Sequence, residues 1–432
     1  GGHHATFLAE QLLRQESSFD SVIRGEGELT ILDLADRLRL ELPLQDTLGL
    51  WFKEKGGTVC KNPGRKKIDD LNSIPFPARD TLQAQLRGGG TPTARVISSR
   101  GCVADCSFCS IPPFERLQKG QLWRARSAEN VLDELTYLRN EFGVKIILFA
   151  EDNFIGPGEA GRERVRQIAE GMKARGLGLR FRILCTAESL VECEPLLPLL
   201  KEAGLERVIV GIESASPSTL AVFNKKTTVE QHYRIARMLA RHDIVLHLGF
   251  MMFQPYSTID DLRANAEFLS KINQACFFQH LSNRMELYPG VAMFDRLEKE
   301  EMIVSTKEYK RGFLYRYANP DVEKLARSLS PIRRRMVDLD KLLLDTDIWI
   351  SHHNGNSSCT HFINKYTTLK KEISSRNLEF FLKSLSLVEP GWNSETFEGL
   401  KNGYLHHIEE LGEALQSIVG SIDIEDASLR PV

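Results

Sequence analysis

The alternation of apolar and polar positions predicts an α/β domain in the middle of the chain. Between about residues 93 and 290, six short β-rich runs alternate with helix-like stretches, several of which begin with Ser, Thr or Asp and end on Gly. The runs are ARVISSRG (94–101), VKIILFAEDNF (144–154), LRFRILCTA (179–187), ERVIVGIES (206–214), DIVLHLGFMMF (243–253) and ACFFQHLSNRMEL (275–287). Such alternation implies parallel strands joined by crossover helices, as in a barrel or an open α/β sheet.

The flanking segments have different patterns. Near the N-terminus, FDSVIRGEGELTILDLADRL predicts a short strand, a glycine turn and a helix, which is only one end of an α/β domain. The stretch PFPARDTLQAQLRGGGTP has the Pro and Gly content of a linker, and past residue 300 the pattern becomes helical. We therefore predict a partial N-terminal domain, a linker, a core barrel and a helical C-terminal domain, at residues 1–60, 61–92, 93–300 and 301–432.

Composition and charge narrow the function classes. The 432 residues carry 56 Lys and Arg against 58 Asp and Glu, a net charge of −2, which argues against bulk binding of nucleic-acid phosphates. No run approaches the roughly eighteen apolar residues of a membrane-spanning helix, and GGHHATFLAEQLL lacks the features of a secretory signal. Eight cysteines are too few for a disulfide-stapled scaffold, which favours a reducing, cytoplasmic compartment. We expect neither a nucleic-acid nor a membrane partner.

Three of the eight cysteines stand close together in the segment SSRGCVADCSFCSIPPF. Cys102, Cys106 and Cys109 have the spacing C-x3-C-x2-C. A structural zinc site takes four ligands, usually from paired C-x2-C arms, and no second arm occurs in the sequence. Three thiolates on a [4Fe–4S] cluster instead leave one iron without a protein ligand, so that this iron can bind and activate another molecule. Three unrelated buried cysteines are a further alternative, which the polar, Gly-rich loop disfavours.

The segment CVADCSFC resembles the C-x3-C-x-aromatic-C loop of the radical S-adenosylmethionine (SAM) enzymes, and it follows the first strand of the β-α series as in that family. The resemblance implies a partial (β/α)6 TIM-like barrel in which Cys102, Cys106 and Cys109 bind three irons of the cluster. SAM would chelate the fourth iron, and its reductive cleavage would give methionine and a 5′-deoxyadenosyl radical that abstracts a substrate hydrogen. Phe108 would pack near the adenine of SAM.

Polar residues at the ends of the later strands extend the resemblance, at the end of a barrel where active sites are built. In ILFAEDNF, Asp152 and Asn153 would contact the SAM amino group, unless the acidic residues only cap a helix. Glu188 follows the third strand, and the sequence leaves two alternatives equally open: a role in the SAM pocket or a position on the surface. Glu213, in the fourth-strand segment GIES, would contact the ribose or methionyl end of SAM, unless it only forms a salt bridge. Gln254 would flank the adenine, in a turn that departs from the family's GFIxGxPxET.

The flanking segments resemble a subfamily with an N-terminal cobalamin (B12)-binding domain. GGHHATF and FDSVIRGEGE are similar to the last part of that Rossmann-like domain, SIPFPARDTL to the link and WRARSAENVLDEL to the first barrel helix. Gly25 and Gly27 would line the cobalamin rim, while Glu26 and Glu28 could cap the next helix. The D-x-H-x-x-G loop that supplies the lower cobalt ligand in many such domains does not occur in the sequence. We expect a truncated domain; the alternative is a reduced domain that no longer binds cobalamin.

The resemblance implies a reaction class but no substrate. If cobalamin binds, the expected reaction is methylation of an unactivated carbon in a metabolite or natural product, with one SAM methylating the cobalt and a second forming the radical. One alternative is a radical SAM oxidoreductase or rearrangement enzyme in which cobalamin is absent or is not a methyl carrier. Another is a non-catalytic module whose cluster serves structure or electron transfer. The expected partners are a small-molecule substrate and a reductant such as flavodoxin or ferredoxin.

Overall fold

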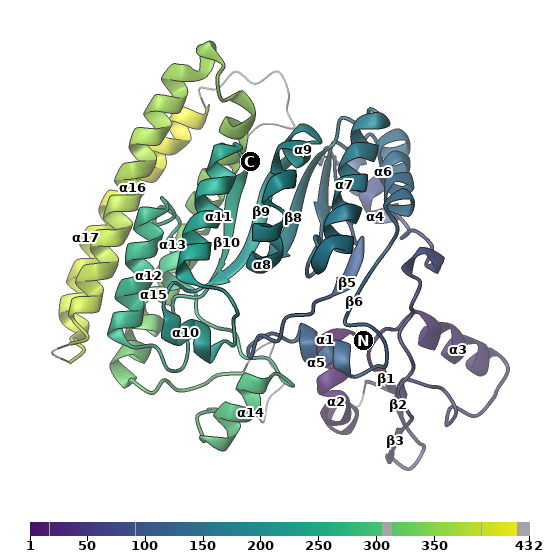
Figure 1. The fold of residues 1–432 in the computed structure, drawn as a ribbon. Coiled ribbons are helices and arrows are strands. Elements are labelled where there is room, and N and C mark those ends of the chain that lie inside the picture. Colours follow the sequence, from purple (N-terminus) through teal and green to yellow (C-terminus); the bar gives the residue numbers. More distant parts are fainter. Residues whose placement is uncertain (17, 91, 305–312, 390, 421–432) are drawn as a thin grey trace. The chain divides into compact units, whose positions relative to one another are not determined.

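The computed structural model describes residues 1–432 apart from 17, 91, 305–312, 390 and 421–432 (Figure 1). The chain divides into two compact units, each built from several chain segments. The first unit comprises Gly1–Pro75, Ser99–Arg126 and Glu286–Tyr315, and the second comprises Phe76–Ser98, Ser127–Met285 and Arg316–Val432. The three clustered cysteines therefore belong to the first unit, and the strands of the predicted barrel belong to the second.

A parallel sheet forms the centre of the second unit. Its strands are β4 (Thr93–Val96), β7 (Ile146–Phe149), β8 (Arg180–Thr186), β9 (Leu205–Glu213) and β10 (Val245–Phe250), in the order β10-β9-β8-β7-β4. The helices after these strands are α6 (Ala128–Phe142), α7 (Gly158–Ala174), α8 (Ala187–Glu192), η2 (Glu194–Leu196), α9 (Leu197–Glu202), α10 (Pro217–Val222), α11 (Val229–Arg241) and α12 (Ile259–Lys271). Because consecutive strands are neighbours and every pair is parallel, right-handed crossovers place the connecting helices on one side of the sheet. The predicted α/β alternation is confirmed for these five strands.

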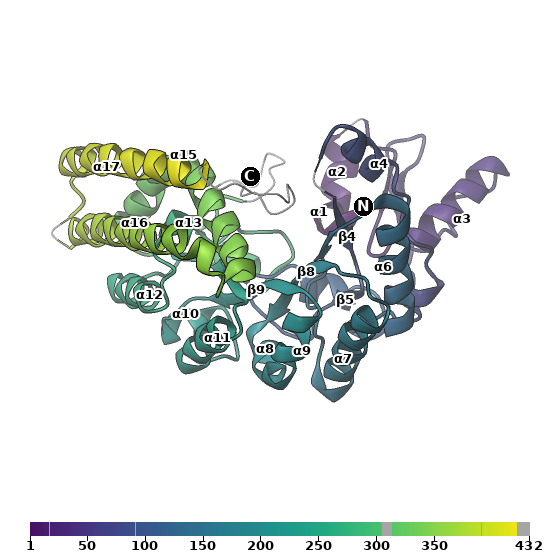
Figure 2. The same ribbon diagram turned by 90° about the horizontal axis from the view of Figure 1, so that it is seen from above.

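The two faces of this sheet differ in burial. Along β9, Val208, Val210 and Ile212 are fully buried and the alternate residues are half-buried, because successive side chains of a strand point to opposite faces. Figure 2 shows α7, α8, α9 and α11 together on one side of β8 and β9, so the buried residues face these helices. We call the opposite face of the sheet the open face. On β9 it carries Arg207, Ile209, Gly211 and Glu213.

The sixth predicted strand, residues 275–287, is wrong. The segment forms the short helix α13 (Phe278–Ser282), and Arg284 makes a single parallel bridge to Phe253. Two helices of the C-terminal region hold its backbone: the Asp340 carboxylate accepts the N–H groups of Phe278 and Gln279 at 2.9 Å each. The Asn377 amide donates to the carbonyls of residues 275 and 276, at 3.1 and 2.9 Å. Backbone groups that a strand would pair with β10 are thus taken up by side chains.

The predicted helical C-terminal region is confirmed. It consists of α15 (Pro320–His353), η3 (Ser357–Cys359), α16 (Thr360–Ser386) and α17 (Ser394–Gly420). The Asn319 side chain caps α15 by accepting from the backbone N–H groups of the second and third helical residues, and Pro320 occupies the first position, where its missing N–H costs no hydrogen bond. No helix of the described residues is long and apolar enough to cross a membrane.

The described residues of the first unit form two small antiparallel sheets. One is formed by β1 (Ser21–Ile23), β2 (Leu50–Lys53) and β3 (Val59–Lys61), and the other by β5 (Ser99–Gly101) and β6 (Trp123–Ala125). The helices are α1 (Gly2–Phe7), α2 (Ala9–Gln15), α3 (Glu28–Arg39), η1 (Leu71–Ser73), α5 (Ile111–Arg116) and α14 (Ala292–Lys299). The predicted strand, glycine turn and helix are therefore β1, the turn and α3.

Three sequence predictions differ from these observations. A Rossmann-like domain has parallel strands, whereas the described strands of residues 1–75 pair only antiparallel. The short turn that joins β2 to β3 permits no parallel crossover between those two strands. The predicted linker 61–92 contains a helix, α4 (Asp80–Arg87), which buries Leu82 in the second unit. The run 94–101 is divided between β4 and β5, which lie in different sheets.

Candidate functional site

The cysteine loop joins β5 to α5 in the first unit. Gly101, the residue before Cys102, has φ = +83°, and a Cβ at this position would overlap the carbonyl oxygen of Leu122 on the approach to β6. Only glycine combines this left-handed backbone with so close a neighbour. The start of the loop is thus fixed by the backbone of the β5–β6 hairpin.

Backbone contacts hold the rest of the loop. The N–H of Ala104 donates to Sγ of Cys102 at 3.4 Å, and the N–H of Cys109 donates to the carbonyl of Cys106 at 3.2 Å. The carbonyl of Ser107 accepts from the N–H of Met293 at 2.8 Å, which ties the loop to α14. Cys102 is buried and the other two cysteines are half-buried, as is Phe108.

The loop does not form a single-ion site. Within the described parts of the chain, no group of three or more His, Cys, Asp or Glu side chains converges where one metal ion could be held. A [4Fe–4S] cluster takes each thiolate on a different iron, so its ligands need not converge on one point. Three sulfur donors on a short loop with a constrained first residue fit that donor set.

A buried ion-pair cluster connects the hairpin to the GEGE segment. The Glu26 carboxylate accepts from Arg124 at 2.7 and 3.1 Å, from Arg100 at 3.2 Å and from the N–H of Ile68 at 3.0 Å. Burial alone would raise the pKa of Glu26, but the hydrogen bonds from Arg124 and Ile68 and the charge of Arg100 hold that pKa below its usual value. Glu28 accepts from Arg100 at 2.6 Å. These carboxylates therefore hold the strands on either side of the cysteine loop, a role different from helix capping.

The predicted cobalamin-contact glycines lie beside the same cluster. Gly25 is buried with φ = +79°, and its N–H donates to Oγ1 of Thr6 at 3.1 Å. The side chain of Gln118 fills the space that a Cβ of Gly25 would occupy, and its Oε1 accepts from the N–H of Glu26 at 2.8 Å. Gly27 precedes α3 and is half-buried. Gln118 thus covers the side of Gly25 that the missing side chain leaves open.

His3 also contacts the region that follows the cysteines. Its ring stacks on Phe114 of α5, with the ring centroids 4.0 Å apart, and its Nδ1 lies 2.9 Å from Oγ of Ser110. Burial lowers the pKa of His3, which favours the neutral imidazole. The GGHH segment therefore packs against the helix that ends the loop.

At the carboxyl end of the sheet in the second unit, Glu151 is a buried carboxyl group after β7. Oγ of Ser98, just after β4, donates to one of its oxygens, and the other oxygen is buried without a hydrogen-bond partner among the described residues. Burial raises the pKa of Glu151 to about 7, although Ser98 and the charge of Arg164 oppose the shift. Arg164 donates to the carbonyl of Ser98 at 2.9 Å. The first and second strand ends are thus joined by Glu151.

The two residues that follow Glu151 differ in exposure. Asn153 is buried, its Nδ2 donates to Oγ of Ser189 at 3.1 Å, and its Oδ1 accepts from the N–H of Thr186 at 3.4 Å. Asp152 is half-buried. The Asn153 side chain therefore connects the ends of β7 and β8.

Glu213 ends β9 in a strained conformation. Its φ is +68°, which non-glycine residues rarely adopt, and its carboxylate lies 3.8 Å from Nζ of Lys225. Lys225 also donates to the carbonyl of Gly211 at 2.8 Å. Burial raises the pKa of Glu213; Lys225 opposes this shift and the nearby carboxylate of Glu188 adds to it. Strained residues of this kind cluster at functional sites.

Glu188 and Gln254, the two other residues predicted to contact SAM, differ in their hydrogen bonding. Glu188 lies in the first turn of α8, and its Oε2 is buried without a hydrogen-bond partner in the described chain. Gln254 is buried; its N–H donates to Oγ of Ser257 at 2.9 Å and its Oε1 accepts from the N–H of Tyr256 at 2.8 Å. The side chain of Gln254 therefore shapes the turn after β10.

The structure therefore brings Glu151, Asn153, Glu188 and Glu213 to the same end of one sheet, while the cysteines and Phe108 belong to the first unit. Nothing in the sequence singles out Ser98 or Arg164. Lys225 stands in the fourth-strand segment as the first lysine after GIES, which is the only local signal for it. No local motif indicates the partners of Glu26, because they are distant from it in the sequence.

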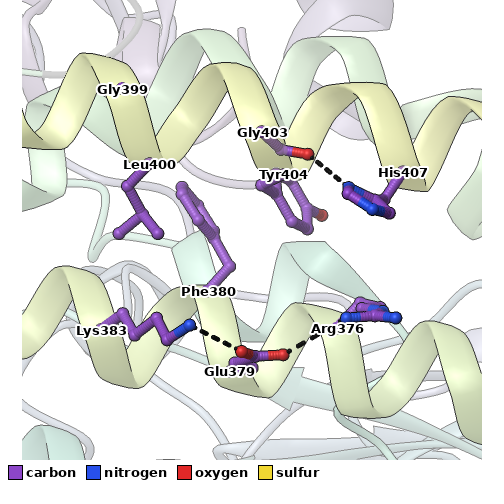
Figure 3. A pocket seen from close by; sticks show the side chains of 9 residues that line it. All are labelled: Arg376, Glu379, Phe380, Lys383, Gly399, Leu400, Gly403, Tyr404 and His407. Atoms are coloured by element: carbon purple, nitrogen blue, oxygen red, sulfur yellow. Dashed lines mark hydrogen bonds and ion pairs between the residues drawn. The ribbon is translucent and has the colours of Figure 1, made fainter.

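Two grooves in the second unit lie apart from these residues. One, of about 340 Å³, lies between α16 and α17 and is lined by Arg376, Glu379, Phe380, Lys383, Gly399, Leu400, Gly403, Tyr404 and His407 (Figure 3). Figure 3 shows the Glu379 carboxylate between the two cations of α16, and it pairs with Lys383 at 2.7 Å and Arg376 at 3.6 Å. The other, of about 290 Å³, includes Val245 at the amino end of β10 and Lys370 of α16. Neither lining includes a predicted cofactor-binding residue.

Three thiols after the first strand of a parallel α/β sheet, with carboxylates at the later strand ends, define a class of protein. Residues 96–269 match the radical SAM superfamily. Members of this superfamily use a [4Fe–4S] cluster and SAM. The resemblance seen in the sequence is confirmed.

The curated relatives narrow the comparison. The chain is 34% identical over 276 residues to an uncharacterized methyltransferase of Pyrococcus horikoshii, a match covering 63% of this chain and 57% of that protein. It is 30% identical over 268 residues to the anaerobic magnesium-protoporphyrin IX monomethyl ester cyclase of Rubrivivax gelatinosus, covering 61% of this chain and 46% of the cyclase. The chain thus spans about half the length of the curated relatives it matches.

Solved structures share the fold. The structure of the cobalamin-dependent S-adenosylmethionine radical enzyme OxsB, with aqua-cobalamin and SAM bound, matches with a TM-score of 0.72 at 20% identity, over 98% of this chain and 68% of that one. The radical SAM methyltransferase TsrM of Kitasatospora setae matches with a TM-score of 0.51 at 17% identity, over 70% of this chain and 57% of TsrM. The likeness to OxsB includes the C-terminal helices, for which the sequence alone offered no comparison.

Proposed function

We propose that the chain is the radical-generating part of a cobalamin-dependent methyltransferase that acts on an unactivated carbon of a small metabolite or natural product. The observation that carries the proposal is the C-x3-C-x2-C loop next to the first strand of a radical SAM domain. The methyltransferase name of the relative from Pyrococcus horikoshii and the aqua-cobalamin bound to OxsB support the choice of reaction. Methylation remains our proposal, since the relatives are longer than this chain.

The cluster would be held by the cysteine loop. Cys102, Cys106 and Cys109 would each ligate one iron and leave the fourth iron for SAM. Bound there, the cluster and SAM supply an electron source and the precursor of a carbon radical. The constrained Gly101 and the bond from Met293 to Ser107 fix the loop backbone, so the protein's own part is to hold three thiolates in a set arrangement.

SAM would be held mainly from the strand ends of the second unit. The carboxyl oxygens of Glu188 and Glu213 would accept from the hydroxyl and amino groups of SAM. Asp152 and Asn153 would face the SAM amino group, with the Asn153 side chain fixed by Ser189. The turn that Gln254 shapes and the ring of Phe108 would flank the adenine. We assign Glu151 a positioning role, because a carboxyl with a pKa of about 7 is largely uncharged below neutral pH and joins two strand ends.

Cobalamin would bind on the side of Gly25 and Gly27. The structure sets one condition: Gln118 covers Gly25, so its amide is either a cofactor contact or must turn away. Cobalamin would serve as the methyl carrier of the reaction. The second candidate is a radical SAM oxidoreductase or rearrangement enzyme. The similarity to the magnesium-protoporphyrin IX monomethyl ester cyclase supports this candidate.

The partners follow from the chemistry. A radical SAM enzyme needs an electron donor, and we propose a reductant such as flavodoxin or ferredoxin. The substrate would be a small molecule rather than a nucleic acid, in keeping with the net charge of −2. Eight cysteines spread over 432 residues fit the reducing cytoplasm as the compartment.

Anaerobic reconstitution with iron and sulfide tests the cluster and the radical chemistry together. The wild type should bind about four irons per chain and form 5′-deoxyadenosine from SAM after reduction. C102A should lose most of the iron and all of the product. C359A is the matched control, because Cys359 lies outside the loop in η3, and it should behave as the wild type. Equal formation of 5′-deoxyadenosine by C102A and the wild type would refute the catalytic proposal.

The methyl carrier is tested separately. The purified chain is incubated with hydroxocobalamin, desalted and examined for cobalt-linked absorbance, and the same is done with Q118A. Retention of cobalamin by the wild type supports the methyltransferase, and altered retention by Q118A supports contact on the side of Gly25. No retention alongside normal 5′-deoxyadenosine formation would favour the second candidate for this chain.

A further inference from the structure

Three arginines form a row across the open face of the parallel sheet. Arg95 of β4 pairs in register with Leu148 of β7, Leu148 with Arg182 of β8, and Arg182 with Arg207 of β9. Residues in register on adjacent strands point to the same face, so the side chains of all three arginines project from one face of the sheet. This is the side that carries Glu213 farther along β9.

The arginines of this row differ in whether a carboxylate pairs with them. Arg182 donates to the Glu206 carboxylate, which also contacts Arg180 and His352. Arg207 forms no hydrogen bond or ion pair with any residue that the structure describes, and its Nε is buried. Burial and the charge of Arg182 lower the pKa of Arg207 to about 10, and the charges of Glu206 and Asp345 oppose the shift. Charged groups removed from water are normally paired, whereas the half-buried Arg207 makes no ion pair within the part of the chain that the structure describes.

His247 presents a second buried nitrogen next to Arg207. It lies on the open face of β10, in register with Ile209, two residues along β9 from Arg207. Its Nδ1 is buried without a hydrogen-bond partner among the described residues, and so is Nε2 of His280 in α13. Burial, followed by the charge of Arg207, lowers the pKa of His247 to about 4, so its imidazole is neutral and offers one N–H donor.

We propose that Arg207 and His247 form an oxyanion subsite for a phosphate or carboxylate group of the substrate. A guanidinium fork beside a neutral N–H donor suits a planar or tetrahedral oxyanion, and Arg182 and Arg95 add positive charge along the row. That the anion belongs to the substrate rests on the proposed function.

The position of the subsite indicates the shape of the substrate. Arg207 precedes Glu213 by six residues on the same face of β9, which is roughly 20 Å of strand. The long arginine side chain shortens that span. The substrate would therefore carry its anionic group at the end remote from the reacting carbon.

The experiment is calorimetric titration of the full chain with inorganic phosphate and, separately, with acetate, at constant ionic strength and without SAM. R207M should bind the preferred anion about tenfold more weakly than the wild type, or worse, because a charge-assisted hydrogen bond is lost. R207K should lie between the two, and H247Q should also be weaker. R241Q removes an exposed arginine at the end of α11 and should bind as the wild type. Tighter phosphate indicates a phosphorylated substrate; tighter acetate indicates a carboxylic acid.

The folding of R207M is checked by its thermal unfolding without anion. Met replaces a half-buried charge that has no ion-pair partner among the described residues by an apolar side chain of similar length, so the melting temperature should not fall. If neither anion binds the wild type, or if R207M binds as tightly, the buried nitrogens only meet water and the proposal is overturned. Formation of 5′-deoxyadenosine is a separate measurement: anion binding through Arg207 without that product would uphold the subsite and count against the proposed function.

Discussion

Replacing Glu26 by Gln removes the charge at the centre of the ion-pair cluster that holds the β5–β6 hairpin. The side chains of Glu26 and Arg124 are only 8% and 3% exposed. In E26Q the Arg124 guanidinium keeps its bond to the carbonyl of Ile68 at 2.6 Å and the carboxylate of Glu115 at 3.4 Å. It loses its main counter-ion, while Arg100 loses the more distant of its two carboxylates and keeps Glu28 at 2.6 Å.

The magnitude follows from these contacts. Breaking a buried ion pair by removing one partner costs about 3–5 kcal/mol in free energy of unfolding. The amide oxygen of Gln still accepts one hydrogen bond, and Glu115 still balances part of the charge, so we expect roughly 2–3 kcal/mol. Because two units need not unfold together, the quantity to measure is local. Amide hydrogen exchange in β5 and β6 should lose roughly 30- to 150-fold of its protection.

The effect should depend on pH with a known sign. The folded pKa of Glu26 lies below the ordinary value of 4.5, so its contribution to stability is complete above that pH and is lost as the pH falls through the lower, folded pKa. The difference in protection between the wild type and E26Q should stay constant from about pH 7 to about pH 5 and narrow in more acid solution.

The control is E28Q, since Glu28 is 38% exposed and, among the described residues, pairs with Arg100 alone. An exposed pair of this kind contributes less than about 1 kcal/mol, so protection in the hairpin should change by no more than about fivefold. A loss of protection in E26Q no larger than in E28Q would refute the role of the buried cluster.

Two further predictions concern Gly101 and Glu151. G101A should lose more hairpin protection and reconstituted iron than G57A, because both glycines have φ near +82° but only the Cβ at 101 meets a backbone oxygen; G57A should cost about 1 kcal/mol. Equal effects would contradict the overlap with Leu122. For Glu151, whose folded pKa is about 7 against 4.5 when unfolded, the wild type should lose up to about 3 kcal/mol relative to E151Q as the pH rises through this range. Thermal unfolding at about pH 5 and pH 8 measures the change, and a pH-independent difference would contradict the buried carboxyl.

The strands of the fold were predictable where apolar runs were flanked by capped helices. β8 and β10 lie within the runs predicted for them, and β9 begins one residue before its run. The run 275–287 failed because a short apolar segment does not distinguish a strand from a buried helix, and the Asp340 and Asn377 contacts that decide the matter come from helices much farther along the chain. The division of 94–101 between two sheets depends on tertiary pairing with β6 and β7, which no local pattern contains.

The residues of the candidate site could be predicted only where they belong to a local sequence motif. The cysteine spacing and the GIES segment are local signals, so Cys102 and Glu213 could be singled out from the sequence. The positive φ of Glu213 could not, because it results from the irregular pairing at the ends of β9 and β10. The row through Arg182 and Arg207 exists only in the register of separate strands, and the pairing of Glu26 with Arg124 spans 98 positions.

The discontinuity of the first unit has a consequence for biosynthesis. The carbonyl of Ser107 in the cysteine loop is bonded to Met293, which the ribosome adds about 190 residues later, or roughly 10 to 40 s at ordinary rates of translation. During that interval the nascent chain already displays Cys102, Cys106 and Cys109 while α14 has not been made. Iron–sulfur delivery to the nascent polypeptide would therefore meet an unobstructed loop, and delivery after chain release would meet a loop that α14 already holds.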